Sequence, residues 1–578
     1  MEKVNITING QAISVPKNYT VLEAAREANI DIPTLCYLKD INQSGSCRMC
    51  VVEVSTARTL QAACVYPVSE GMVVTTNSKK VRDARKTTLE LLLSDHDRKC
   101  LTCVRNRNCE LQKLSEELGV TDITYDGMTI KHDLDESSPS FVRDNNKCVL
   151  CRRCISACKT IQTVSVIDAV NRGFATQVAC AFDKELGSVS CVNCGQCIVS
   201  CPTGALREKD YTGDVWNAIN DPDKYVIVQT APAVRAALGE EFGFEMGTPV
   251  TGKMAAALRR MGFDKVFDTD TGADFTIMEE GTELIQRIQN GGVLPMITSC
   301  SPGWIKFCEH EYPDFLPNLS TCKSPHEMFG ALLKTYFAEK NGIDPAKVFV
   351  VSIMPCVAKK FEAQRPEMGG KYPDVDVVLS TRELARMIKQ SGLDFANLPD
   401  EGFDDPFGQE SGAAVIFGAT GGVMEAALRT VAEVLDKKPL ENIEFEAVRG
   451  VQGIKEATLN IAGMEVKVAI AHGLGNARKL LDDIRAGKAT YHFIEIMACP
   501  GGCVNGGGQP IVNAKVRMDK DIRAERAKAL YAEDKKSTVR QSHKNPDVDK
   551  VYKEFLGEPC GHKSHELLHT HYTARPKY

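Results

Sequence analysis

Three features are missing from this sequence of 578 residues, and each absence narrows what the protein does. There is no basic excess, because 70 Lys and Arg stand against 76 Asp and Glu, a formal net charge of −6. Nucleic-acid binding needs a basic patch, so it is not expected. There is no uninterrupted apolar run of about 18 residues, so we expect no membrane-spanning helix. The opening MEKVNITING does not have the pattern of a secretory leader, and we expect a cytoplasmic protein.

Cysteine, by contrast, is abundant. The chain has 23 cysteines, and most of them stand two or three residues apart in groups. Disulfides are not expected in a large chain without an export signal. Cysteines that served only as small buried apolar residues would be scattered along the chain. The grouped spacing therefore indicates metal binding or catalysis.

The first group lies in residues 1–80, where two short strands joined by Asn9-Gly10 precede a helical segment. A hairpin followed by a helix is typical of a small β-grasp domain. Its cysteines follow the spacing C-x10-C-x2-C-x13-C, at Cys36, Cys47, Cys50 and Cys64. Four thiolates fit a [2Fe–2S] cluster, and a structural zinc ion is the alternative.

The second group lies in residues 81–132 and has the pattern H-x3-C-x2-C-x5-C, at His96, Cys100, Cys103 and Cys109. Taken alone, three cysteines and one histidine also suit zinc. After a [2Fe–2S] domain, the same pattern resembles the His-ligated [4Fe–4S] cluster of iron-only hydrogenases and of the large peripheral subunit of respiratory NADH dehydrogenase. A neutral imidazole in place of a thiolate tends to raise the cluster potential.

Residues 133–209 hold two copies of C-x2-C-x2-C-x3-C, the pattern of two-cluster bacterial ferredoxins. The fourth cysteine of each copy ligates the other cluster. One predicted cluster is therefore held by Cys148, Cys151, Cys154 and Cys201, and the other by Cys191, Cys194, Cys197 and Cys158. Such clusters only carry electrons one at a time, so the chemistry must lie in the rest of the chain.

In residues 210–578, short apolar strands alternate with helical segments, which predicts α/β architecture. Cys356 ends a strand in IMPCVAKKFE, and α/β folds collect ligand sites at such ends. Cys499 and Cys503 lie in MACPGGCVNGGGQP. This density of glycine predicts that the backbone passes close to something bulky.

Three of these segments, TSCSPGW, MPCVAKKFE and EIMACPGGCVNGGGQP, resemble the signature segments of iron-only ([FeFe]) hydrogenases. The N-terminal cysteine groups resemble those of the longer members of that family and of the large peripheral subunit of respiratory NADH dehydrogenase. The resemblance covers essentially the whole chain. It implies a two-lobed catalytic domain and the reversible reaction H2 = 2H+ + 2e−. It also implies one [2Fe–2S] cluster, three [4Fe–4S] clusters and an H-cluster, in which a [4Fe–4S] cubane joins a di-iron unit carrying CO, cyanide and azadithiolate.

The resemblance also assigns roles to residues. It makes Cys356, Cys499 and Cys503 cubane ligands, with Cys503 bridging to the di-iron unit. Cys300 falls on the thiol that passes protons to the azadithiolate. The remaining implied positions are the proton path Glu280, Ser320 and Glu283, the cyanide donor Lys359, and the apolar walls Pro232, Met354, Phe417 and Met497.

The chain departs from the family pattern at three positions. Ser301 stands where a cysteine ligates the cubane, Ala233 where a serine is common and His326 where a glutamine is common. In one interpretation the Ser301 oxygen is a ligand, although alkoxide is a harder partner for iron–sulfur than thiolate. Alternatively, Cys300 shifts to ligate, or one iron stays with three thiolates. We favour Ser301, because Cys300 is then free to pass protons.

The implied partners are soluble ferredoxin, or flavoprotein and iron–sulfur subunits of an NAD-linked, electron-bifurcating complex. The NADH-dehydrogenase-like N-terminus and Ser301 favour the complex. No flavin or nicotinamide motif is visible in the sequence, so a partner would carry both cofactors. Two other hypotheses stay open: an electron-transfer subunit without hydrogen chemistry, and a hydrogen sensor.

Overall fold

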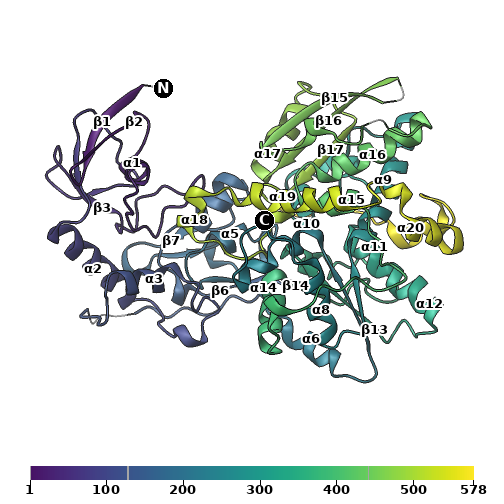
Figure 1. Cartoon of the computed structure of the whole chain (residues 1–578), viewed down its shortest axis with the longest axis horizontal. Helices are drawn as coiled ribbons and strands as arrows, with labels where there is room; N and C mark the ends of the chain where they lie inside the picture. The colour runs from purple at the N-terminus through teal and green to yellow at the C-terminus, as the bar shows by residue number, and fades with distance from the viewer. Residues whose placement is uncertain (1, 126–128, 441, 462, 578) are drawn as a thin grey trace.

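The computed structural model describes residues 2–125, 129–440, 442–461 and 463–577. In Figure 1 the N-terminal strands lie at one end, short helices fill the middle, and two larger α/β lobes occupy the other end. The C-terminal segment returns to the middle of the molecule, between the lobes and the N-terminal part (Figure 1). Among the described helices, none combines the length and apolar character that crossing a membrane requires.

The N-terminal domain is a five-stranded sheet in the order β2-β1-β5-β3-β4 with one helix. The predicted hairpin is formed by β1 (Lys3–Ile8) and β2 (Gln11–Pro16), which pair antiparallel. Helix α1 (Val21–Glu27) begins with a capping box between Thr20 and Glu23. The other strands are β3 (Val51–Val54), β4 (Gln61–Ala62) and β5 (Val73–Thr75). This is the β-grasp arrangement that the sequence predicts.

Short elements form the middle of the molecule, where cysteine-bearing loops dominate. They are α2 (Lys79–Ser94), α3 (Glu110–Glu117), β6 (Phe141–Arg143), α4 (Arg153–Ser156), β7 (Asp168–Val170), β8 (Gln177–Ala179), α5 (Gln196–Ser200) and β9 (Leu206–Glu208). A buried ion pair between Arg153 and Glu110, at 2.7 Å, joins α4 to α3. Arg153 also donates to the Tyr37 carbonyl at 2.9 Å, so one guanidinium holds three segments together.

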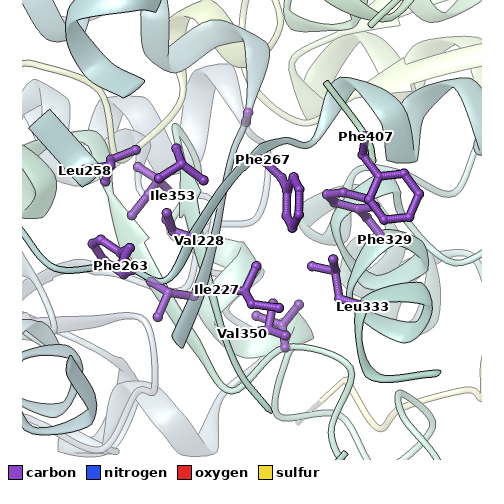
Figure 2. Packing of buried hydrophobic residues seen from close by; sticks show 14 of the residues in the cluster. Ile227, Val228, Leu258, Phe263, Phe267, Phe329, Leu333, Val350, Ile353 and Phe407 are labelled. Carbon is purple, nitrogen blue, oxygen red and sulfur yellow. The ribbon is translucent and has the colours of Figure 1, made fainter. Parts of the chain in front are cut away.

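The first α/β lobe has a parallel four-stranded sheet in the order β11-β10-β13-β14. Its strands are β10 (Tyr225–Thr230), β11 (Lys265–Asp268), β13 (Val348–Met354) and β14 (Val377–Ser380). Figure 2 shows Ile227 and Val228 packed with Val350 of the neighbouring strand. Phe267 meets Phe329 edge-on, with ring centroids 5.9 Å apart. Such a continuous apolar core is expected when both faces of a parallel sheet are covered.

The second lobe has a four-stranded sheet in the order β12-β17-β16-β15. Strands β12 (Met296–Ile297), β16 (Met464–His472) and β17 (Phe493–Met497) run parallel, while β15 (Ile454–Ile461) pairs antiparallel with β16. Helix α9 (Asp270–Asn290) packs against α11 (Pro325–Leu332) of the first lobe and α16 (Gly422–Asp436) of the second. This long helix therefore ties the two lobes together.

Residues 210–578 contain further helices. They are α6 (Thr212–Ile219), α7 (Pro232–Arg235), α8 (Thr251–Arg260), α10 (Pro302–Glu311), α12 (Ala338–Asn341), α13 (Ala358–Glu362), α14 (Thr381–Gln390), α15 (Gly412–Val415), α17 (Leu474–Arg485), α18 (Ala514–Asp519), α19 (Ile522–Lys536), α20 (Pro546–Val551) and α21 (His562–Leu568). The carboxyl ends of β10, β13, β12 and β17 are followed by the segments that meet between the lobes. Open α/β sheets bind ligands at such strand ends.

Candidate active site and cluster cavities

A cavity of about 830 Å³ lies where the two lobes meet. The first lobe contributes Met354 and Cys356 at the end of β13, and the second contributes Met497 and Cys499 at the end of β17. The other residues of the sequence-predicted site that line it are Pro232, Ala233, Cys300, Ser301, His326, Lys359, Phe417 and Cys503. The fold thus gathers into one cavity residues that are far apart in the sequence.

The cysteines of this cavity are free thiols, of which Cys499 is buried and Cys300, Cys356 and Cys503 are half-buried. All 23 cysteines of the chain are free. Burial, followed by the nearby charge of Cys356, raises the pKa of Cys503 to about 12. Burial together with Cys356, Cys194 and Cys503 raises the pKa of the Cys499 thiol well above its usual value. Unpaired thiols that crowd together in an apolar cavity suit a cluster whose iron ions would compensate the thiolate charge.

The glycine-rich segment approaches other backbone closely rather than leaving open space. A Cβ atom on Gly506 would lie 2.2 Å from the Pro355 carbonyl oxygen, and one on Gly507 would lie 2.5 Å from that of Cys194. At Gly502, where φ is +96°, a Cβ atom would lie 2.7 Å from the Thr420 nitrogen. The backbone of the glycine-rich segment therefore packs directly against the neighbouring loops, which are the bulky neighbour that the sequence indicated. This close packing brings Cys499 and Cys503 to the cavity wall.

Cys300 and Ser301 lie at the start of α10 and both line the cavity. The Ser301 hydroxyl accepts a hydrogen bond from the Ala498 N–H at 3.2 Å. Ala498 directly precedes Cys499 in the sequence, so this hydrogen bond holds the Ser301 oxygen against the segment that carries Cys499. Burial and the nearby Glu280 raise the pKa of Cys300 well above its usual value. Cys300 is therefore a protonated thiol at neutral pH.

Behind Cys300, α9 presents two buried carboxyl groups three residues apart. Glu280 is 1% exposed, and neither of its oxygens has a hydrogen-bond partner among the described residues. Burial and the neighbouring Glu283 raise the pKa of Glu280 to about 8. Ser320 donates to Glu283 at 3.0 Å, and Arg287 pairs with Glu283 at 2.6 Å. The structure thus brings the four predicted relay residues into one region.

On another wall of the cavity, Lys359 is held by two acceptors. Its Nζ donates to Glu362 at 2.6 Å and to the Cys300 carbonyl at 3.2 Å. His326 Nε2 lies 2.6 Å from the same Glu362 oxygen. Burial alone would raise the pKa of Glu362, but Lys359 and His326 lower it to about 2. The carboxylate is therefore ionised and shared between the lysine and the histidine.

Sequence reasoning missed Glu362. It lies in the quoted segment MPCVAKKFE, three residues after Lys359, and residues at this spacing share one face of a helix. A basic and an acidic residue at i and i+3 was therefore an available signal. The hydroxyl of Ser352, 3.1 Å from His326 Nδ1, had no such signal, because strand packing alone brings the two together.

In the N-terminal domain, Cys36, Cys47, Cys50 and Cys64 lie in mutual contact. The Cys36 N–H points to the Cys47 sulfur at 3.3 Å. Hydrogen bonds from the thiols of Cys47 and Cys64 hold the pKa of Cys36 well below its usual value. Cys50 in turn is hydrogen-bonded to Cys64. These contacts fit the predicted four-thiolate site.

The histidine-containing group lies between α2 and α3. His96 follows α2, Cys100 begins a short helical turn that ends just before Cys103, and Cys109 precedes α3. Burial lowers the pKa of His96 to about 4, so its imidazole is neutral. The His96 Nδ1 is buried without a hydrogen-bond partner in the described part of the chain. A neutral imidazole with a free nitrogen is what a metal ligand requires.

All eight cysteines of the ferredoxin-like motifs line a second cavity of about 860 Å³. Cys194 lines both this cavity and the one between the lobes. A Cβ atom on Gly195 would lie 2.9 Å from the Gly507 Cα, so the two cysteine-bearing loops touch. One residue therefore separates the two cavities.

Comparisons with known proteins agree with this arrangement. Residues 224–507 match the family "iron only hydrogenase large subunit, C-terminal domain", and 520–575 match "iron hydrogenase small subunit". Residues 1–79 match a 2Fe-2S iron-sulfur cluster binding domain. Residues 85–124 match the NADH-ubiquinone oxidoreductase-G iron-sulfur binding region.

Full-length relatives are similar over the whole chain. The NADP-reducing hydrogenase subunit HndD of Solidesulfovibrio fructosivorans is 52% identical over 100% of both chains. Iron hydrogenase 1 of Clostridium pasteurianum is 44% identical over 98% of this chain and 99% of its own. A solved structure of the [FeFe]-hydrogenase HydA1 from Chlamydomonas reinhardtii is 43% identical and covers 64% of this chain and 100% of its own, with a TM-score of 0.57. With cavity, cysteine motifs and full-length similarity in agreement, the chain belongs to the iron-only hydrogenase family.

Proposed function

We propose that this chain is the hydrogen-activating subunit of an NADP-linked hydrogenase complex. As a member of the iron-only hydrogenases, it catalyses H2 = 2H+ + 2e− and relays the electrons through iron–sulfur clusters. The observation that carries the proposal is the cavity between the lobes. The thiols that we propose as cluster ligands line it together with Cys300, and Cys194 lines both this cavity and the ferredoxin-like one.

Four side chains would hold the catalytic cubane. They are Cys356, Cys499, Cys503 and Ser301, of which Cys503 would bridge to a di-iron unit carrying CO, cyanide and azadithiolate. When bound, that unit supplies the open iron position at which dihydrogen is split or formed. The side chains of Pro232, Met354, Phe417 and Met497 would exclude water from it, and Lys359 would donate a charge-assisted hydrogen bond to a cyanide.

The chain's own residues would move the proton. Cys300 holds a proton at its sulfur, and Glu280 beside it has a pKa of about 8, raised by burial and by Glu283. A carboxyl group with a pKa near the working pH both accepts and releases protons readily. Ser320, which donates to Glu283 at 3.0 Å, would connect Glu280 to Glu283 and from there to the surface beside Arg287.

Electrons would leave through one [2Fe–2S] and three [4Fe–4S] clusters. We divide the chain for this purpose into residues 1–80, 81–132, 133–209 and the catalytic part 210–578. The ferredoxin-like cluster next to Cys194 would be the first acceptor. The NADP-reducing function in the name of the 52% identical relative supports a complex in which a flavoprotein partner reduces the nicotinamide. Soluble ferredoxin is the second partner we propose.

Infrared spectroscopy tests the proposal. The chain is expressed with the proteins that assemble the di-iron unit, and the purified enzyme is assayed for hydrogen uptake with a viologen dye. We expect bands of bound CO and cyanide together with turnover. Cys503→Ala, which removes the bridging thiol, serves as the control and should lose both. A protein with a full complement of iron and sulfide but without these bands would instead be an electron-transfer subunit.

Co-purification tests the complex. An affinity tag on the chain should bring down a flavin-containing partner from the native host, and the mixture should reduce NADP with hydrogen. An isolated monomer that turns over only with ferredoxin would contradict the complex while leaving the hydrogenase activity intact. A chain with CO and cyanide bands but negligible turnover would favour the hydrogen sensor.

A further inference from the structure

Glu362 lies behind the first-lobe wall of the cavity, where it contacts the lining residues Lys359 and His326. The residue is 2% exposed, and its Oε2 atom accepts from three side chains. Lys359 Nζ donates at 2.6 Å and the Ser324 hydroxyl at 3.0 Å, and His326 Nε2 lies at 2.6 Å. An ionised carboxylate has no proton to give, so the His326 Nε2 atom must carry the proton of this hydrogen bond.

The other ring nitrogen of His326 fixes the same tautomer. Its Nδ1 atom lies 3.1 Å from the Ser352 hydroxyl. Burial lowers the pKa of His326 to about 4, so the ring is neutral and carries one N–H. With that proton on Nε2, Nδ1 accepts from Ser352 and both nitrogens are satisfied. The ring is thereby fixed between strand β13 and helix α13.

Glu327 adds a constraint from behind the ring. It is fully buried, lies 3.2 Å from His326 Nε2, and has no hydrogen-bond partner for either oxygen among the described residues. Burial and the charge of Glu362 raise the pKa of Glu327 well above its usual value. The neutral form of Glu327 is therefore favoured. The Nε2 proton goes to the Glu362 oxygen, which is the closer acceptor at 2.6 Å.

A buried histidine often does no more than fill space and satisfy its own hydrogen bonds. Here, however, the histidine shares one carboxylate oxygen with Lys359, whose Nζ lies at the cavity wall and contacts the Cys300 carbonyl at 3.2 Å. An ammonium group has three protons. Two of them are taken by Glu362 and the Cys300 carbonyl, which leaves the third for the cavity.

We propose that His326 is a positioning residue for Lys359. By donating to the Glu362 oxygen that also accepts from Lys359, it keeps the carboxylate from turning towards the lysine alone. It thereby fixes the direction in which the ammonium group points its third proton into the cavity. Because the group that would accept this hydrogen bond is a cyanide of the di-iron unit, the inference rests on the proposed function.

Two replacements of His326, by Leu and by Gln, distinguish a positioning role of this histidine from a packing role. His326→Leu fills similar space but removes both hydrogen bonds, whereas His326→Gln keeps an amide that can donate to Glu362. We expect His326→Leu to shift the cyanide infrared bands of the matured enzyme more than its CO bands. The loss of a hydrogen bond to a charged group predicts about tenfold lower turnover. His326→Gln should restore most of the band positions, which a packing role would not explain.

A second histidine offers a matched control. His543 has neighbours of the same kind, a hydroxyl and a carboxylate, with Nδ1 3.3 Å from the Thr430 hydroxyl and Nε2 3.4 Å from a Glu433 oxygen, but it does not line the cavity. His543→Leu should leave the cyanide bands unchanged. Bands of a folded, iron-replete His326→Leu enzyme that match those of the wild type would overturn the proposal.

Two further measurements keep the inference separate from the proposed function. Ser352→Ala removes only the hydrogen bond at Nδ1, and should shift the cyanide bands in the same direction by a smaller amount.

A crystal structure of His326→Leu without the di-iron unit should show Lys359 withdrawn from the Cys300 carbonyl. An unchanged contact of about 3.2 Å would overturn the positioning role. Absence of CO and cyanide bands from the wild-type enzyme would instead contradict the proposed function.

Discussion

Two buried carboxyl groups, Glu280 and Glu362, lie behind the cavity-lining residues Cys300 and Lys359, and their surroundings are opposite. Glu280 has no hydrogen-bond partner in the described structure, and burial together with Glu283 raises its pKa to about 8. Glu362 receives Lys359, His326 and Ser324, and despite burial its pKa falls to about 2. Since the two residues are chemically identical, their neighbours alone determine their roles. An unpartnered carboxyl group can pass protons, and a fully hydrogen-bonded carboxylate can hold a cation in place.

Removing the unpartnered carboxyl group should cost the most activity. Glu280→Gln keeps the size of the side chain but cannot take or release a proton. Because general acid–base groups contribute roughly 10²- to 10⁴-fold to rates, we expect hydrogen turnover to fall by about that factor. The cyanide and CO bands should persist, because the cluster ligands are untouched. Turnover within threefold of the wild type would remove Glu280 from the proton path.

Removing the hydrogen-bonded carboxylate should instead cost stability. Glu362→Gln leaves Lys359 as a buried cation without its counterion, and breaking a buried ion pair destabilises proteins by about 3–5 kcal/mol. We expect a lower melting temperature of the apo-protein, measured by circular dichroism, and poorer loading of the cluster. The double variant Glu362→Gln with Lys359→Met removes both charges and should recover much of the stability. A Glu362→Gln protein that melts like the wild type would contradict this role.

The two carboxyl groups should also give opposite pH dependence of unfolding. The pKa of Glu280 is raised in the folded state, so its contribution to stability is fully present below pH 4.5 and is lost as pH rises towards about 8. The pKa of Glu362 is lowered, so its contribution is present above pH 4.5 and is lost as pH falls towards about 2. Melting curves of the apo-protein from pH 4.5 to 8 should therefore show a smaller decline in Glu280→Gln than in the wild type. Equal declines would contradict the raised pKa.

The same comparison shows what the sequence could predict. Cysteine spacing predicted the N-terminal cysteine groups, because most ligands of one cluster lie a few residues apart in the sequence, whereas the cubane ligands were implied only by the resemblance to the family. Glu280 and Glu283 could be paired for a similar reason, since three residues on one helix place them on one face. The neighbours that give Glu362 its low pKa come from α11 and α13, which only the packing of the first lobe brings together. His326 was noticed as a departure from the family pattern, but its partners could not be predicted from the sequence.

Substitution of Ser301 should have the smallest effect of the changes considered. Its outcome decides whether Cys300 belongs to the proton path together with Glu280. If the Ser301 oxygen ligates the cubane, Ser301→Cys supplies a softer thiolate that iron–sulfur clusters prefer. The potential and the electron paramagnetic resonance spectrum of the cubane should then change, while turnover stays within a few-fold because Cys300 was already free. If Cys300 is the ligand instead, the new cysteine releases it, and turnover should rise markedly. Unchanged spectra and potential would mean that neither the serine nor its replacement contacts the cluster, and Glu280 would then be adjacent to a thiol whose role has to be assigned anew.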